Sequence, residues 1–439
     1  MSASSDLLVT AYGAVTGAGD ECEFRAAWLD GASAVRPFEG NHEGLPPGYG
    51  AAVPWKHKEL RGLPGGRGMR PGTMTASTFL AVGGVGRALA NAGLEDPSSD
   101  SPEVADRRGV YLGAYTNFPA LKKHLKLVHI MGSEAAAEAG EYQIDDARIM
   151  DGMKGFTGFD FLKLMNNMPT AHGAIQAHGR GPANTFLGYS SVGLQTISRA
   201  CDGLRLGLAD QFVAGACGPG TMEGLALVHG AHGLLAAEGL EPSSAARPLD
   251  RDASGLVPGD GGAALVIETA ANVAQRGVRP IARVAACRDL FVAPTAPRGP
   301  LPDSSGIQRL LQQTLSLAGW KPQEVDYLSA TGLGVATLDR LEAEAYGAVF
   351  GGHLGSLYLA VHTGVIGFTE AAHGPIGAVG ALQAMQDGKL PPQVNMDELW
   401  PGLDGLQRVR EASSGDVRKA LIVSLAPEGT LSALALERS

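Results

Sequence analysis

The sequence predicts an α/β protein of two related halves, in which layers of helices and strands alternate. Segments with helical and strand character alternate along nearly the whole chain of 439 residues, and this alternation is typical of layered α/β folds. The segment LANAGLEDP leads, after an insertion, to the strand-like GVYLGAY, and LSLAGWKPQ leads to VDYLSAT in the second half. The repeated order of helix, Ala-Gly, polar loop and strand favours a duplicated βαβαβ unit.

Composition and charge narrow the class of protein. Apolar residues make up 44% of the chain, and its 62 glycines suit turns and close helix–sheet packing rather than disorder. The net charge of −10 argues against binding to nucleic acid or to an anionic membrane. The four cysteines show neither a CxxC pair nor a Cys/His cluster, so neither a metal site nor a disulfide framework is indicated. With no signal-peptide pattern and no long apolar run, we expect a cytoplasmic protein.

The first half is predicted to span residues 1–268, with irregular or mixed insertions at about residues 35–72 and 116–170. Apolar runs and their breaks predict helices at residues 21–29, 73–92 and 192–206, and strands at residues 7–14, 109–115, 185–187, 212–216 and 263–267. In the third helix Leu194, Ile197, Cys201 and Leu204 recur at helical spacing, so Cys201 is predicted to lie in the core.

The second half is predicted to span residues 269–439. Its helices are expected at residues 306–318, 338–349 and 373–385, the last of them opened by Gly374 and Pro375. Strands are expected at residues 325–330, 357–362, 420–424 and 431–436.

The stretch NTFLGYSSVGLQTI, residues 184–197, predicts a strand, a sharp turn and a helix. Such a turn lifts one side chain into a pocket, and here that side chain is Ser190. A free serine hydroxyl is unreactive near neutral pH unless a general base activates it.

Several segments resemble the β-ketoacyl-acyl carrier protein synthases. The segment ARPLDRDASGLVPGDGGAALVIE is similar to the family's RPFD…DGFV.GEGA..LVLE, and LSATGLGVATLDRLEAE is similar to its HGTGT…D..E. The opening LLVTAYGAVTGAG resembles VVVTG.G.VTP.G, and Gly181 and Pro182 precede the turn as they do in that family. These segments follow the family's order over nearly the whole chain.

The resemblance implies the thiolase-like fold, with layers in the order α/β/α/β/α and a dimer built across the turn. It also implies a chemistry in which a cysteine at the turn carries the acyl chain as a thioester. Two histidines then stabilise the enolate that forms when CO₂ leaves, and a lysine supports the second histidine. Substrates are expected on the phosphopantetheine arm of an acyl carrier protein, with no metal or further cofactor.

This chain departs from the family at two or three of its catalytic positions. Ser190 stands at the cysteine, Thr331 stands at the first histidine and Thr369 at the lysine. Aligning GPIGAVG with HSLGAAG places Gly374 at the second histidine, whereas a slip of one residue places His373 there. The family's GFGG.N loop is represented by APEGTL, residues 426–431, which has lost most of its glycines.

The chain resembles most the inactive branch of the family, the chain-length factor or ketosynthase β subunit of type II polyketide synthases. That branch implies a partner, the active ketosynthase α subunit, and a tunnel at the interface whose depth is set by bulky β-subunit side chains. We expect Phe118, Phe159, Phe161, Met165 and Met168 to line the tunnel or the interface. The branch usually carries Gln at the turn, so Ser190 is a departure from it as well.

Two other hypotheses stay open at this point. Ser190 could be the nucleophile of an acyltransferase or hydrolase with His373 as its base, and His172 and His178 could also reach the pocket. Alternatively, the chain could be a homodimeric scaffold that binds a carrier protein without chemistry. Asp339 and Glu342, one helical turn apart, are interpreted as holding the loop before their helix rather than as an acid/base pair.

Overall fold

The structure is a computed structural model that describes residues 6–37, 48–66, 70–115, 150, 154, 158–295 and 301–439. Within these residues, eleven strands form one continuous sheet, and ten of them lie in the order β11-β10-β14-β15-β9-β1-β8-β7-β5-β6. The eleventh, β2 (Gly19–Asp20), pairs with β1 at the end of the first hairpin.

The two halves of this sheet have the same topology. The first half contains β1 (Leu7–Thr16), β5 (Arg108–Ala114), β6 (Ala183–Leu187), β7 (Gln211–Pro219) and β8 (Asp260–Thr269). The second half contains β9 (Ala282–Phe291), β10 (Tyr327–Ser329), β11 (Tyr358–Ala360), β14 (Lys419–Leu425) and β15 (Thr430–Arg438). When the strands of each half are numbered along the chain, both halves read 3-2-4-5-1 across the sheet. The predicted duplication is therefore confirmed at the level of strand order.

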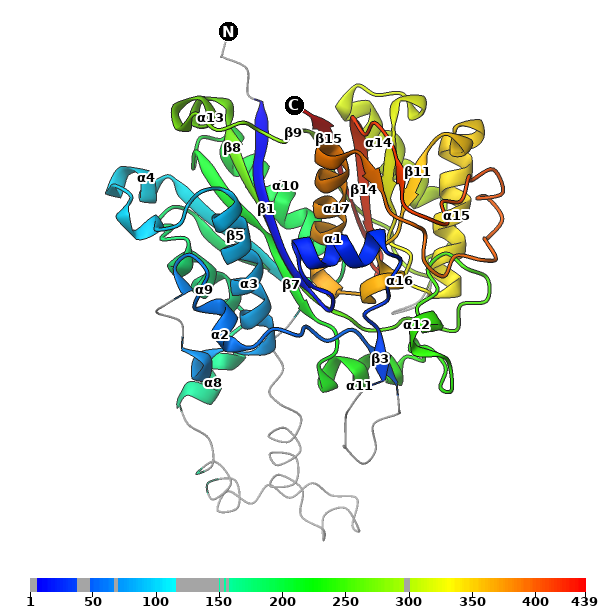
Figure 1. Cartoon of the computed structure of the whole chain (residues 1–439), viewed down its shortest axis with the longest axis horizontal. Helices are drawn as coiled ribbons and strands as arrows, with labels where there is room; N and C mark the ends of the chain where they lie inside the picture. Colours follow the sequence, from blue (N-terminus) through cyan, green and yellow to red (C-terminus); the bar gives the residue numbers. More distant parts are fainter. Residues whose placement is uncertain are drawn as a thin grey trace.

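The helices and the two halves of the sheet together form five layers. Helices α3 (Ala76–Asn91) and α9 (Met168–Gln176) cover the outer face of the first half, and α14 (Ser305–Ala318) and α15 (Ala336–Phe350) cover that of the second half. Between the halves lie α10 (Val192–Arg205) and α17 (His373–Asp387), as Figure 1 shows. The strands meet only briefly there, where Leu8 and Val9 of β1 pair with Arg283 and Ala282 of β9. The predicted order α/β/α/β/α is confirmed.

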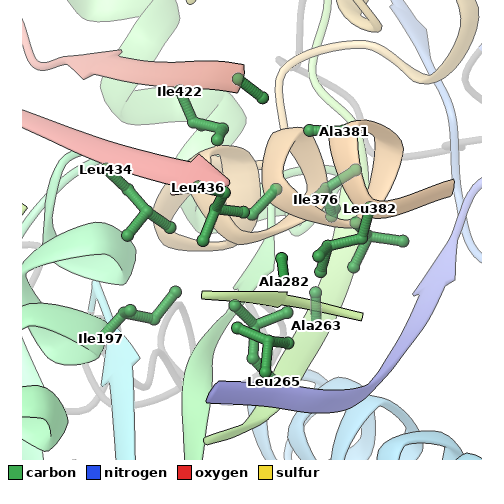
Figure 2. Close-up of a cluster of buried hydrophobic side chains, with 14 of the residues drawn as sticks. Ile197, Ala263, Leu265, Ala282, Ile376, Ala381, Leu382, Ile422, Leu434 and Leu436 are labelled. Atoms are coloured by element: carbon green, nitrogen blue, oxygen red, sulfur yellow. The ribbon is translucent and has the colours of Figure 1, made fainter. Parts of the chain in front are cut away.

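The middle layer is held by apolar packing from both halves. Ile197 of α10 and Ile376 and Leu382 of α17 pack against Leu265 of one half and Leu434 of the other (Figure 2). Each of these side chains is almost fully buried, and each such burial stabilises the fold by about 1.5–3 kcal/mol. Cys201 belongs to the same cluster, which confirms its predicted place in the core.

The element at residues 21–29 shows why the local sequence folds as predicted. Helix α1 (Glu21–Leu29) begins with a capping box, in which Asp20 accepts from the Glu23 backbone and Glu23 accepts from the Asp20 backbone. Its apolar side chains Phe24 and Trp28, one turn apart, are fully buried.

The remaining elements are short. The helices and single turns are α2 (His57–Leu60), α4 (Pro102–Asp106), α8 (Gly158–Leu164), α11 (Glu223–Ala231), α12 (Pro242–Ala245), α13 (Ala270–Arg276), α16 (Thr363–Ile366), η2 (Pro71–Thr73), η3 (Pro97–Ser99), η4 (Pro322–Glu324), η5 (Gly351–Gly355) and η6 (Glu370–Ala372). Two small hairpins pair β3 (Arg36–Pro37) with β4 (Tyr49–Gly50), and β12 (Lys389–Leu390) with β13 (Ser413–Ser414).

Candidate functional site

The turn that carries Ser190 lies between β6 and α10, as the sequence predicted. Strand β6 ends at Leu187 and α10 begins at Val192. Gly193, in the first turn of α10, allows a close approach to η6, because a Cβ there would lie 2.2 Å from the carbonyl oxygen of Ala371. Ser190 itself is fully buried at this junction. The turn is thus wedged between the two halves at the amino-terminal end of α10.

The hydroxyl of Ser190 is hydrogen-bonded to a backbone carbonyl. Its Oγ donates a hydrogen bond of 2.7 Å to the carbonyl oxygen of Leu425, at the end of β14. The neighbouring Ser424 Oγ donates in return to the carbonyl oxygen of Ser190 at 2.8 Å. A serine that acts as a nucleophile gives its proton to a general base. The proton of Ser190 is instead donated to a backbone carbonyl oxygen, which cannot act as a general base.

Thr331, which the resemblance places at the family's first histidine, is fully buried, and its hydrogen bonds connect two segments of the chain. Its Oγ1 accepts from the backbone N–H of Leu425 at 3.0 Å, and its own backbone N–H donates to Glu342 at 2.7 Å. The backbone of Leu425 therefore joins the two replaced positions, since its N–H reaches Thr331 and its carbonyl reaches Ser190.

His373 lies beside Thr331 but is not hydrogen-bonded to Ser190. Its Nε2 donates to the carbonyl oxygen of Thr331 at 2.9 Å. Its ring centroid lies 4.3 Å from that of His362, a residue that no motif in the sequence assigns to the site. Burial lowers the pKa of His373 to about 4, so the ring is neutral near pH 7 and a weak base. His172 bonds the carbonyl oxygen of Met168 at 3.0 Å, in the outer helical layer.

Gly374 and Thr369 are the residues that one alignment places at the family's second histidine and lysine. A Cβ at Gly374 would lie 2.6 Å from Cγ of Leu194, so a side chain there collides with α10. Thr369 is fully buried, and its Oγ1 has no hydrogen-bond partner in the described part of the chain. The alternative assignment of the family's second histidine, to His373 or Gly374, stays a prediction.

Asp339 and Glu342 hold the loop that carries Thr331. Asp339 accepts from the backbone N–H groups of Leu333, Gly334 and Leu249 at 2.7–2.9 Å. Glu342 accepts from those of Thr331 and Gly332 at 2.7 and 2.9 Å. Burial, together with the charge of Glu342, raises the pKa of Asp339 to about 7, although these hydrogen bonds oppose the shift. The prediction that the pair fixes the loop is confirmed.

The predicted tunnel or interface residues divide into three groups. Phe118 lies outside the described residues. Phe159 and Phe161 of α8, and Met165 just after it, are each about half exposed, at 57%, 50% and 49%. Met168, at the start of α9, is buried. The exposed three are not ordinary core side chains in this chain, and the role of all five stays a prediction.

Within the described part of the chain, every helix falls short of the length and apolar character that crossing a bilayer requires. No group of three or more His, Cys, Asp or Glu side chains among those residues is arranged to hold a metal ion.

Comparison with known proteins agrees with this geometry. Residues 8–272 match the family model "Beta-ketoacyl synthase, N-terminal domain", and residues 291–397 match "Beta-ketoacyl synthase, C-terminal domain". The chain therefore belongs to the β-ketoacyl synthase family.

Its relatives include 3-oxoacyl-[acyl-carrier-protein] synthases and a ketoacyl synthase beta subunit. It is 28% identical to the tetracenomycin polyketide synthase ketoacyl synthase beta subunit of Streptomyces glaucescens, over 100% of both chains. It is 27% identical to 3-oxoacyl-[acyl-carrier-protein] synthase 2 of Mycobacterium tuberculosis, over 69% of this chain and 72% of that protein. Among solved structures, the ishigamide ketosynthase/chain length factor has the same fold, with a TM-score of 0.81 at 22% identity over 100% of both chains.

Proposed function

We propose that this chain is a non-catalytic, chain-length-factor-like subunit of a type II polyketide or polyene synthase. It pairs with an active ketosynthase and shapes the tunnel for an acyl chain that a carrier protein delivers. The observation that carries this proposal is the convergence of both replaced catalytic positions, Ser190 and Thr331, on the backbone of Leu425.

Condensation needs groups that this site lacks. The family's reaction uses a thiolate as the nucleophile and leaving group, and imidazole donors at the enolate oxygen. Here the resemblance places buried Ser190 and Thr331 at the cysteine and the first histidine, and Gly374 or the weakly basic His373 at the second histidine. Removing one such donor from an enzyme typically costs about 10²–10³-fold in rate, so losing several leaves no useful condensation.

The serine-enzyme alternative requires a base that reaches Ser190. His373 donates to Thr331 instead, and its lowered pKa leaves it a poor proton acceptor. The geometry therefore favours the subunit role over a Ser190 acyltransferase or hydrolase.

The relatives support a paired role. The tetracenomycin protein is described as a β subunit and aligns with this chain from end to end. The ishigamide structure is described as a ketosynthase/chain length factor. A second similar structure, with a TM-score of 0.78, contains a type II polyketide synthase acyl carrier protein in complex with its ketosynthase. These structures are 22% and 21% identical to this chain, so they support the fold and only suggest the partners.

One surface of the chain has the character that pairing requires. Strand β6 is the last described strand at its edge of the sheet, and its Leu187 is 53% exposed. A hollow of about 430 Å³ beside it is lined by residues of β6 and of the start of α9. The exposed Phe159 and Phe161 of α8 lie on the segment that leads into α9. An edge strand next to apolar side chains is a favourable surface for another subunit.

Co-expression with an active type II ketosynthase α subunit tests the proposal. We expect a stable heterodimer by size-exclusion chromatography with light scattering, and elongation of carrier-bound acyl chains only by the pair. Leu187→Arg places a charge at the β6 edge and should abolish pairing. Leu317→Arg, at a 61% exposed position on α14, is the matched control and should leave it intact.

Two outcomes would contradict the proposal. Elongation by this chain alone would show that the site is catalytic. A stable homodimer that binds carrier protein, and that no α subunit can dissociate, would favour the scaffold hypothesis.

A further inference from the structure

A hollow of about 890 Å³, here called the seam pocket, lies where β1 of the first half meets the start of β9 of the second half. Polar side chains from both halves line it, among them Tyr12 of β1, Asn91 of α3, Arg279 just before β9, and Gln383 and Gln386 of α17. A volume of this size is typical of sites for small molecules. The two halves of the fold therefore form one polar cavity between them.

The seam pocket is separate from the site around Ser190. Gln386 lies thirteen residues after His373, the first residue of α17. Because an α-helix rises about 1.5 Å per residue, the two residues are about 20 Å apart. The pocket thus lies at the opposite end of α17 from His373 and its partner Thr331, and the replaced catalytic positions do not explain it.

The amide side chains of the seam pocket leave two acceptors without donors. Gln383 Nε2 donates to the carbonyl oxygen of Glu21 at 2.8 Å, but its Oε1 is buried and has no hydrogen-bond partner in the described part of the chain. Asn91 Nδ2 donates to Tyr12 O and to Glu21 Oε1, both at 2.8 Å, whereas its Oδ1 accepts from none of the described residues. An amide oxygen without a donor is costly when buried, and a hydroxyl group that reaches it removes that cost.

Arg279 brings an unpaired positive charge to the seam pocket. Its side chain is exposed and pairs with no carboxylate among the described residues. The neighbouring charges are paired, because Glu21, which is buried, binds Arg87, and Arg438 binds Asp416 at 2.7 Å. A guanidinium in this state can donate two parallel hydrogen bonds to the oxygens of a carboxylate or a phosphate.

We propose that the seam pocket binds a small oxyanion that carries hydroxyl groups, such as a hydroxy acid or a sugar phosphate. Arg279 binds the oxyanion, and the side-chain oxygens of Gln383 and Asn91 accept hydrogen bonds from the hydroxyl groups. Because both halves line the pocket, a bound ligand also stabilises the folded state. This inference goes beyond the proposed pairing role and does not depend on it.

Cys22 allows occupancy of the seam pocket to be measured at the site itself. Its side chain is exposed and lines the pocket, whereas Cys201 and Cys217 are buried. We would follow alkylation of Cys22 by iodoacetamide with peptide mass spectrometry, at mildly alkaline pH because partial burial raises the pKa of this thiol. The probe is glycerol 3-phosphate, which carries both a phosphate and hydroxyl groups. Glycerol and inorganic phosphate at matched ionic strength are the controls, and calorimetry gives the dissociation constants.

Glycerol 3-phosphate should slow the alkylation of Cys22 in a saturable manner and raise the melting temperature. Glycerol should do neither, and inorganic phosphate should bind at least about tenfold more weakly, the usual scale for losing a hydrogen bond of this kind. Arg279→Gln should weaken binding of glycerol 3-phosphate by roughly tenfold or more. Arg309→Gln, at an exposed position on α14, makes the same change of charge and should bind like the wild type.

Arg279→Gln should fold normally, because the side chain is exposed and holds no ion pair in the described part of the chain. The proposal would be overturned if glycerol 3-phosphate did not bind to the wild type, or if it bound without slowing the alkylation of Cys22. Equal binding by Arg279→Gln and the wild type, or equal binding of inorganic phosphate and glycerol 3-phosphate, would overturn it as well.

Discussion

Ser190 and Leu425, which are 235 positions apart, are joined by a hydrogen bond of 2.7 Å from the serine hydroxyl to the leucine carbonyl. The turn at Ser190 is thus joined by this hydrogen bond to a strand of the other half of the sheet. The contact links the start of α10 to the end of β14, across the middle layer.

Restoring the family's nucleophile should not restore the reaction. In Ser190→Cys, residues 331 and 374 would still be threonine and glycine rather than histidine. Condensation of carrier-bound thioesters should therefore stay undetectable by mass spectrometry. Ser190→Ala should lower the free energy of unfolding by about 1–3 kcal/mol, because it leaves the buried Leu425 carbonyl without its donor. Elongation by the Ser190→Cys chain alone would contradict the account.

A histidine at residue 374, one of the two candidate positions of the family's second histidine, should destabilise the fold unless α10 is also changed. Because a Cβ at residue 374 would lie 2.6 Å from Leu194, Gly374→His should destabilise the protein by roughly 1–3 kcal/mol, the usual cost of overpacking. Leu194→Ala in the same chain makes room, so the double variant should be more stable than the sum of the two single changes predicts. Urea unfolding of all four proteins measures this coupling, and strictly additive changes would show that Leu194 is not the obstacle.

The loop that carries Thr331 should depend on Asp339. Asp339→Ala leaves three buried backbone N–H groups without acceptors, so we expect the free energy of unfolding to fall by about 3 kcal/mol or more. Glu344→Ala, on the exposed face of the same helix, should change it by less than about 0.5 kcal/mol. Equal effects in urea unfolding would mean that Asp339 is not holding the loop.

Acid should destabilise the protein through the buried His362 and His373. The unfolded chain protonates His373 near its usual pKa of 6.5, whereas the folded state does so only near 4. The unfolded state therefore binds more protons between these values, and stability falls as pH drops through that window. The loss from His373 alone is about 2 kcal/mol between pH 7 and pH 5.

A substitution at His362 distinguishes the contributions of the two histidines to the pH dependence of stability. Burial lowers the pKa of His362 too, and neither of its ring nitrogens has a hydrogen-bond partner among the described residues. In His362→Phe the new ring packs against Phe24 and Trp28, so the variant should be as stable as the wild type at pH 7. Its free energy of unfolding should fall less than that of the wild type on acidification. An unchanged dependence on pH in denaturant unfolding would contradict the assignment.

The sequence predicted the elements whose signals are local. Helix α1 matches its predicted bounds because Asp20 and Glu23 cap it and its apolar side chains recur at helical spacing. Strand β9 was not predicted, because its charged residues Arg283 and Asp289 interrupt the apolar pattern and are typical of a loop. In the fold they pair with Glu437 on β15 and with Arg199 on α10, and that pairing is visible only in three dimensions.

The site residues were named from the resemblance alone, so their roles stay predictions, and their contacts could not be predicted. The resemblance located the replaced positions, Ser190 and Thr331, in the sequence. It could not show that both bind the backbone of Leu425, because a backbone contact leaves no trace in side-chain identity. The side chains of His229 and Glu370, 141 positions apart, lie 2.6 Å from each other, and no shared motif predicts this contact. The boundary between the halves at residues 268 and 269 stays a prediction.

The central claim is that this chain shapes a site without performing its chemistry, and intact-mass spectrometry tests it most directly. The chain would be exposed to acyl-carrier thioesters alone and together with a ketosynthase α subunit. The account predicts no acyl adduct on this chain in either sample, and acylation only on the cysteine of the partner. An acyl adduct on this chain that disappears in Ser190→Ala would contradict it and make Ser190 a nucleophile.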